Sequence, residues 1–234
     1  MSTCTRRTSI LYWMILTLML CARPSAAADL TDVEMRWLRG IWPVVVYAKD
    51  SGLPLDLVVQ PQPAAGEAPF ALAFVDGRCK FVLTLRGSDE GRVALDRIPA
   101  TLRESALELM AAHELGHCRR HLDGAWLQMP TGFKPAQPED QAPGSGSAER
   151  DMRGQRREEA YADLVGLAWV RWRHADQYAA LQAWLVAERS RDRIEGSPHD
   201  TLAWIRHVAD PSVPPGSTIF QTATTLWHAG LDVR

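Results

Sequence analysis

The chain has 234 residues, of which 46% are hydrophobic and 23% charged. This length and apolar content suffice for one domain with a substantial core. Its 26 basic and 28 acidic residues give a net charge of −2, and no basic stripe marks a nucleic-acid surface, so we expect no nucleic-acid partner.

The N-terminal segment has the pattern of a secretory signal peptide. Two arginines precede an apolar run at residues 10–20, and small residues follow at 26–28. The apolar run is too short to span a bilayer, which takes about 20 residues. We therefore expect residues 1–28 to be removed. The mature chain, beginning at Asp29, is then exported to the periplasm or beyond and has no membrane span.

Signal removal changes the charge and the cysteine count. Three arginines leave with residues 1–28 and no acid does, so 23 basic residues face 28 acidic ones and the net charge becomes about −5. Cys79 and Cys118 remain, an even number in an oxidising compartment. We expect a disulfide between them. Two buried thiols, or Cys118 near a metal without binding it, are the alternatives.

The first half of the mature chain predicts one helix followed by three strands. Apolar residues recur at helical spacing between residues 30 and 49, where Pro43 should break or kink the helix. Asp76-Gly77 between two apolar runs is a hairpin signal. The expected strands are 55–60, 70–75 and 79–85.

A longer helix is expected at residues 101–122. Thr101 and Glu104 form a capping-box pattern, apolar residues at helical spacing bury one side, and Gly124 is a stop signal. Gly116 inside this helix costs about 1 kcal/mol relative to alanine. A packing or functional reason, such as room for a substrate or a crossing helix, would explain it.

This helix carries the sequence His113-Glu114-Leu115-Gly116-His117, a complete HExxH motif. Histidines at i and i+4 lie one turn apart on one helix face, so both can coordinate one Zn²⁺ ion at roughly 2.0–2.1 Å. Glu114 then lies beside a metal-bound water that it can deprotonate. The alternative is a surface helix with two solvated histidines.

A third ligand is expected downstream, because a catalytic zinc takes three protein ligands and keeps one open position. Glu159 and Asp163 are also i and i+4, so a helix places both carboxylates on one face. Glu159 could bind the metal, while Asp163 accepts the outward N–H of a ligating histidine.

These two elements resemble the gluzincin zinc peptidases. The run Glu159-Ala160-Tyr161-Ala162-Asp163 looks like the Glu-x-x-Ala-Asp element of the CAAX-prenyl-protease and HtpX-like branch, and thermolysin-type enzymes have a similar spacing. The resemblance covers two short helices, about a fifth of the chain. It implies an α+β, mainly helical, zincin-like domain with a small sheet before the motif helix. It also implies a strand that pairs with substrate, for which residues 80–86 are the candidate unless they form an ordinary core strand.

Other ligands are less suitable. The metzincin extension requires glycine at 120 and histidine at 123, where this chain has Arg120 and Asp123. His121 lies one turn beyond His117, about 6 Å along the helix, and reaches a shared metal poorly. Glu158 points roughly 100° away from its neighbour, which indicates a solvated position.

The segment 129–155 is rich in Pro, Gly, Ser and Gln, and we expect a mobile loop that serves as a lid or is simply exposed. Helical patterns follow, and four tryptophans fall at core or groove positions. The expected helices are 156–173, 176–193, 200–209 and 218–229, and the tryptophans are Trp169, Trp172, Trp184 and Trp204.

His199 is the candidate for stabilising an oxyanion. In the prenyl-protease-like branch a His followed by an Arg has this place, and His199 and Arg206 are similar at a different spacing. The alternative is that Ser197 or Asp200 caps a helix and His199 is merely exposed.

The sequence therefore predicts an exported zinc metallopeptidase that binds one Zn²⁺ through His113, His117 and Glu159, with Glu114 as base and a peptide or protein as substrate. A non-catalytic zinc-containing binding or assembly factor, and an amidase acting on cell-wall peptides, are the alternatives. Glu114 argues against the first, because a purely structural site does not need it. No signal for an oligomeric state is visible.

Overall fold

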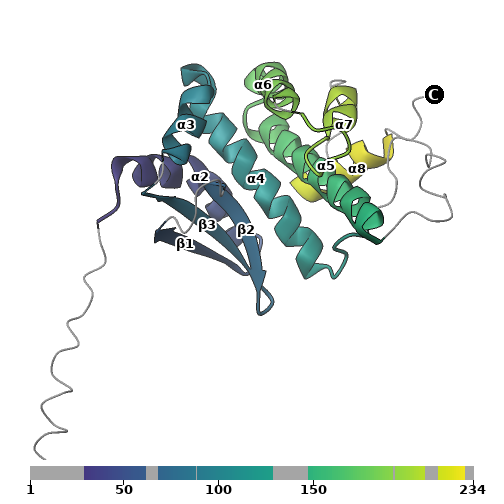
Figure 1. Cartoon of the computed structure of the whole chain (residues 1–234), viewed down its shortest axis with the longest axis horizontal. Helices are drawn as coiled ribbons and strands as arrows, with labels where there is room; N and C mark the ends of the chain where they lie inside the picture. Colours follow the sequence, from purple (N-terminus) through teal and green to yellow (C-terminus); the bar gives the residue numbers. More distant parts are fainter. Residues whose placement is uncertain are drawn as a thin grey trace, which may run out of the picture. The chain divides into compact units, whose positions relative to one another are not determined.

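One long helix, α4 (Arg103–Leu122), lies between a three-stranded sheet and a group of helices in the computed structural model of the chain (Figure 1). The structure describes residues 29–61, 68–87, 89–128, 147–191, 193–208 and 216–229. The expected signal peptide and residues 129–146 of the expected loop lie outside these. The architecture is α+β and mainly helical, as the sequence predicts.

Helix α2 (Asp32–Asp50) begins with a capping box that the sequence analysis did not identify. The Thr31 hydroxyl accepts from the Glu34 amide at 3.2 Å, and Glu34 Oε2 accepts from the Thr31 amide at 2.6 Å. Pro43 lies inside the helix, which runs through it without the expected break. The buried face consists of Trp37, Ile41, Val44 and Ala48.

The three expected strands form one sheet in the order β1-β3-β2. β2 (Phe70–Val75) and β3 (Arg78–Arg86) are antiparallel, and their turn residues Asp76 and Gly77 both have positive φ, as a two-residue hairpin turn requires. β1 (Leu55–Pro61) pairs with β3 in parallel. Because β3 is the central strand and its residues 80–83 are paired on both sides, this part of the expected segment 80–86 cannot receive a substrate strand. Among the described strands, β2 is the edge strand that lies beside α4.

A short connection leads from the sheet into α4. It consists of α3 (Glu90–Arg97) and a 3₁₀ turn (Ala100–Leu102). The expected cap at Thr101 is wrong, because this residue lies in the 3₁₀ turn and Leu102 precedes α4 without a side-chain cap. The end of α4 agrees with the prediction, since Gly124 follows it with a φ of 64°.

The second half of the chain is helical, as expected. α5 begins at Ser147, so the residues after 146 that were expected to be a loop belong to this helix. No helix in the described part of the chain has the length and apolar character needed to cross a membrane. The remaining elements are α5 (Ser147–Arg173), a 3₁₀ turn (Ala175–Gln177), α6 (Tyr178–Ser190), α7 (Leu202–His207) and α8 (Ile219–Ala229).

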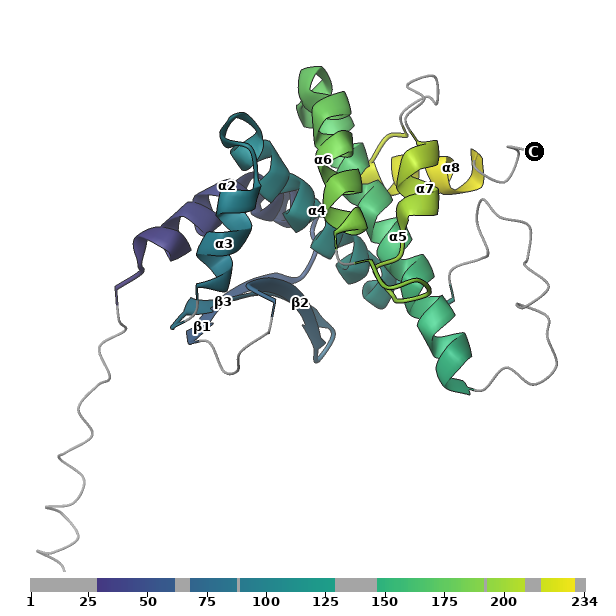
Figure 2. The same cartoon turned by 45° about the horizontal axis from the view of Figure 1, so that its top comes forward.

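Helices α4 and α5 cross at small residues, which brings their backbones close together (Figure 2). A Cβ atom added at Gly116 would lie 3.2 Å from the Ala162 Cα atom, and one at Gly166 would lie 2.9 Å from the Leu109 carbonyl oxygen. The helix propensity lost at Gly116 is thus exchanged for close packing against a crossing helix. α4 is buried around most of its circumference, and not on one side only as its pattern suggests.

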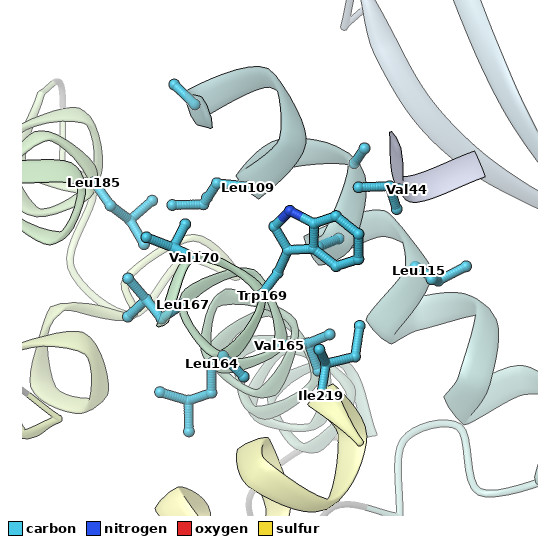
Figure 3. Packing of buried hydrophobic residues seen from close by; sticks show 14 of the residues in the cluster. Val44, Leu109, Leu115, Leu164, Val165, Leu167, Trp169, Val170, Leu185 and Ile219 are labelled. Atoms are coloured by element: carbon cyan, nitrogen blue, oxygen red, sulfur yellow. The ribbon is translucent and has the colours of Figure 1, made fainter. Parts of the chain in front are cut away.

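The core is continuous around α4 and α5. Trp169 projects from α5 toward Val44 of α2, and Leu185 of α6 lies on another side of α5 (Figure 3). Trp204 is buried as expected, and Trp184 is half-buried. Trp172 is 58% exposed, so it is not a core residue.

The expected disulfide between Cys79 and Cys118 is present, with Cα atoms 5.6 Å apart. It ties the central strand β3 to α4 immediately after His117. Both cysteines are buried.

Candidate metal centre

Two helices supply three side chains whose ligand atoms converge. α4 contributes His113 and His117, whose Nε2 atoms are 3.1 Å apart, and α5 contributes Glu159. Glu159 Oε2 lies 3.4 Å from Nε2 of His113, and Oε1 lies 3.3 Å from Nε2 of His117. The i, i+4 spacing on α4 and the close helix crossing together produce this arrangement.

Asp163, one turn after Glu159, holds the other side of His113. Its Oδ1 atom lies 2.9 Å from His113 Nδ1, so the carboxylate accepts the Nδ1 proton and turns the Nε2 atom toward Glu159. Arg189 donates two hydrogen bonds to Asp163, at 2.6 and 3.0 Å, and the Thr201 hydroxyl donates a third at 2.6 Å. Each of the two oxygens of this buried carboxylate thus accepts two hydrogen bonds.

The charges of this cluster depend on one another. Burial disfavours the charged form of His113, but hydrogen bonds to Asp163 and Glu159 outweigh it and raise the pKa of His113 to about 10. Burial likewise opposes ionisation of Glu159, yet the two histidines hold its pKa well below the ordinary value. Arg189 and His113 lower the pKa of Asp163 in the same way, against its burial. Both carboxylates are therefore ionised in the folded chain.

The three side chains open into a cleft of about 600 Å³. Glu114 lines this cleft next to the two histidines and is partly exposed. One wall comes from β2 and α3, the opposite wall from α6, and α4 forms the base. Arg189 and Trp184 of α6 also reach the cleft. A small molecule or an extended chain can therefore approach the cluster from solvent.

His199 lies at the cleft, as its predicted role requires. Its Nε2 atom is 3.6 Å from Glu159 Oε2, and its side chain is 68% exposed. The turn that carries it is held by an Arg193–Asp200 ion pair at 2.6 Å and by Asp200 accepting from the Gly196 amide. Asp200 therefore stabilises this turn, and α7 begins without a side-chain cap.

Two residues near the motif differ from expectation. Glu158 is fully buried and not solvated, because Arg120 of α4 donates two hydrogen bonds to it at 2.9 and 3.0 Å. His121 points into the cleft region but stacks between two aromatic rings. Tyr161, between Glu159 and Asp163 in the sequence, is not among the residues that line the cleft, and its hydroxyl donates to the Phe220 carbonyl at 3.3 Å.

The sequence analysis did not identify Arg189 or Thr201. Arg189 lies in an ordinary charged run at the end of α6, and no spacing relates it to Asp163. Thr201 ends the polar run of residues 197–201 around His199, and its position there does not indicate a partner. Only the packing of α6 and the following turn against α5 brings both to the carboxylate.

Comparison of the chain with protein-family models, characterised proteins and solved structures finds no match. The chemistry of this cluster therefore has to be inferred from its own residues and their geometry.

Proposed function

We propose that the protein is a zinc-dependent metallopeptidase of gluzincin type. The observation that carries this proposal is the convergence of His113, His117 and Glu159 in a cleft that also contains Glu114. A purely structural zinc site would have four protein ligands and no open position. Here the described residues offer three, and all three line a cleft from which a water or substrate could reach a bound ion.

The donor set fits a zinc ion. A tetrahedral ion with bonds of roughly 2.0–2.1 Å requires ligand atoms about 3.3–3.4 Å apart. The two histidine Nε2 atoms are 3.1 Å apart, and Glu159 places Oε2 3.4 Å from that of His113 and Oε1 3.3 Å from that of His117. One ligand atom from each of the three residues lies within 4.8 Å of the other two. Three lone-pair donors this close repel one another unless a proton or a cation lies between them. Imidazole nitrogens with one carboxylate are ligands that suit zinc.

When bound, the ion supplies Lewis-acid chemistry, polarising the scissile carbonyl and lowering the pKa of a water toward about 7. Glu114 accepts a proton from the attacking water and delivers it to the departing amine. His199, exposed at the mouth of the cleft, donates to the carbonyl oxygen as negative charge develops there. Asp163 keeps His113 in the tautomer that binds metal.

The edge strand β2 supports a peptide as substrate. Its residues 70–72 line the cleft, and β3 pairs with only one of its edges. An extended peptide can add to such an edge through backbone hydrogen bonds, which tolerate many side chains. The substrate strand is thus proposed at β2, one strand away from the position expected from the sequence.

We also propose that the mature chain is exported. The Cys79–Cys118 disulfide supports an oxidising compartment. Mass spectrometry of material exported by cells should find a mature chain that begins at Asp29. A chain that retains Met1 in that material would contradict the proposed processing.

Cleavage of a broad peptide library by the purified, zinc-loaded mature protein tests the peptidase proposal. The library should contain cell-wall peptides, so that an amidase of that specificity is also detected. We expect cleavage that a chelator abolishes. Glu114→Gln should keep its zinc and lose about 10²- to 10⁴-fold in turnover, because it removes a base and no ligand.

Glu104→Gln, an exposed position on the same helix, is the matched control and should behave like the parent. Full activity of the Glu114→Gln variant would contradict the mechanism. A zinc-loaded parent that cleaves no member of the library would favour a non-catalytic binding factor.

A further inference from the structure

The turn that follows α4, residues 123–128, brings Trp126 to the metal cleft. The Trp126 ring stacks on the ring of His121 at 4.1 Å, and Phe74 of β2 stacks on the other face of His121 at 4.9 Å. Trp126 also meets the His117 ring edge-on at 5.5 Å. Trp126 and His121 both line the cleft, so an aromatic wall stands beside one metal ligand.

Buried charges hold this turn in place. Arg120 donates to the Ala125 carbonyl at 2.6 Å while it forms its ion pair with the buried Glu158. Its guanidinium also lies over the Tyr161 ring, 5.7 Å from the centroid. A buried ion pair often adds little to the free energy of folding, but it can fix one arrangement of the groups around it. Here it fixes the backbone next to Trp126.

The backbone of the turn is also strained. Leu127, directly after Trp126, has a φ of 61°, in the left-handed region that non-glycine residues rarely adopt. Such strain persists only where the surroundings enforce it, and it concentrates at functional sites. The side chain of Leu127 is 38% exposed, so burial of this side chain does not explain the conformation.

We propose that Trp126 and His121 determine specificity by contacting a large apolar side chain of the peptide bound across the metal cluster. This inference rests on the proposed peptidase function and adds a substrate class to it. The turn presents Trp126 rigidly, so little side-chain entropy is lost when a ligand binds against it.

The chemistry of the wall explains the preference. The Phe74 and Trp126 rings cover both faces of the His121 ring. His121 therefore presents only its ring edge to a ligand, and its face supports the Trp126 ring. Phe70 and Leu72 of β2 also line the cleft and add apolar surface. An aromatic or long aliphatic side chain gains contact with these groups, whereas a charged side chain placed against the Trp126 ring would exchange water for an apolar face.

Two sets of peptides test the proposal, one for each position that flanks the cleaved bond. Within a set the peptides are identical except that this position holds Phe, Leu, Ala or Asp. At one position we expect the parent to prefer Phe and Leu over Ala and Asp by about ten-fold or more in kcat/KM. Trp126→Ala should reduce that ratio by roughly 3- to 10-fold, mainly through KM, with zinc content unchanged. Trp126→Phe should keep most of it, and Trp126→Leu should lower the preference for Phe over Leu.

Trp172→Ala, which removes an exposed tryptophan outside the cleft, is the control and should leave the ratio unchanged. An unaltered ratio in Trp126→Ala would overturn the proposal. An equal loss on all peptides, or loss of zinc, would also overturn it and make Trp126 a support for His117 alone.

Binding of the same peptides, fluorescently labelled, to zinc-loaded Glu114→Gln separates this inference from the peptidase proposal. If the parent cleaves nothing, the proposed function fails. If adding Trp126→Ala to this variant reduced the affinity for Phe and Leu peptides relative to Ala and Asp peptides, the apolar wall would still be supported. If no peptide bound, or the relative affinities did not change, the proposal would be overturned.

Discussion

Asp163 connects most of the polar residues around His113 and the proposed metal site. It is ionised and buried, which would be costly without partners, and it receives hydrogen bonds from His113, Arg189 and Thr201. Arg189 balances its charge, while Thr201 adds a neutral donor. The orientation of His113 therefore depends on two residues that bind no metal themselves.

Replacing Thr201 by valine tests this dependence, because the shape is kept and only the donor is lost. We expect the free energy of unfolding to fall by about 1–3 kcal/mol, as for a buried acceptor left with fewer donors. Zinc affinity, measured by competition with a chromophoric chelator, should fall by about 10-fold. Thr101→Val, at an exposed position, is the control. Parental zinc affinity in Thr201→Val would show that the hydroxyl does not help to orient His113.

The residues that the sequence grouped together and the structure brings together are those whose relation is local. His113 with His117, and Glu159 with Asp163, are each one helical turn apart, so a helical pattern suffices to place each pair on one face. Arg189 acts across 26 positions of sequence, and only the packing of α6 on α5 brings it close. The spacing of residues along one helix does not reveal which residues of another helix will contact it.

The crossing of α4 and α5 sets the distance between the two histidines of α4 and the two carboxylates of α5. Gly116→Ala should destabilise the protein by about 1–3 kcal/mol, although alanine is the better helix former, because the new methyl group meets Ala162 and Val165 at 3.2 Å. Urea unfolding measures the effect.

Gly154→Ala in α5 is the matched control. Its methyl group would come no closer than 3.4 Å to Leu127, so we expect a gain of up to about 1 kcal/mol from helix propensity. If both variants were stabilised, the close approach of the two helices would not be the reason for Gly116.

Local periodicity also explains which elements were predicted well. The helices and strands were found because their apolar spacing is regular, and the Asp76-Gly77 turn because its conformation demands such residues. Glu158 was misjudged because its partner Arg120 comes from another helix. Residues 80–86 belong to the central strand β3, which is the alternative given for them, and the sequence could not decide this because strand order depends on pairing.

At the scale of the whole molecule, the cleft lies between two groups of elements that meet at α4. The sheet and α3 form one side, and α5 and α6 form the other. The Cys79–Cys118 disulfide joins the sheet to α4 close to His117. The buried Glu34 of α2 adds a second link to the sheet, because Arg86 of β3 donates two hydrogen bonds to it, at 2.7 and 3.1 Å.

The Glu34 link should make stability depend on acidity. Arg86, opposed by burial and aided by Thr31, lowers the pKa of Glu34 below its ordinary value of 4.5. A carboxyl whose pKa is lower in the folded state stabilises that state above pH 4.5, and this stabilisation disappears as the pH falls through the folded-state pKa. In metal-free protein, Glu34→Gln should therefore be less stable than the parent at pH 7, with the difference shrinking below pH 4.5. Urea midpoints across this range measure it, and a difference that does not vary with pH would contradict the pKa argument.

The most direct test of the metal centre is zinc stoichiometry by native mass spectrometry after dialysis against Zn²⁺. We expect one zinc ion per chain in the parent, and loss of that ion in His113→Ala, His117→Ala and Glu159→Ala. His121→Ala removes a neighbouring histidine that is not a ligand, and it should still hold one ion. A parent without zinc, or a Glu159→Ala variant that binds zinc as tightly as the parent, would contradict the assignment of the three ligands.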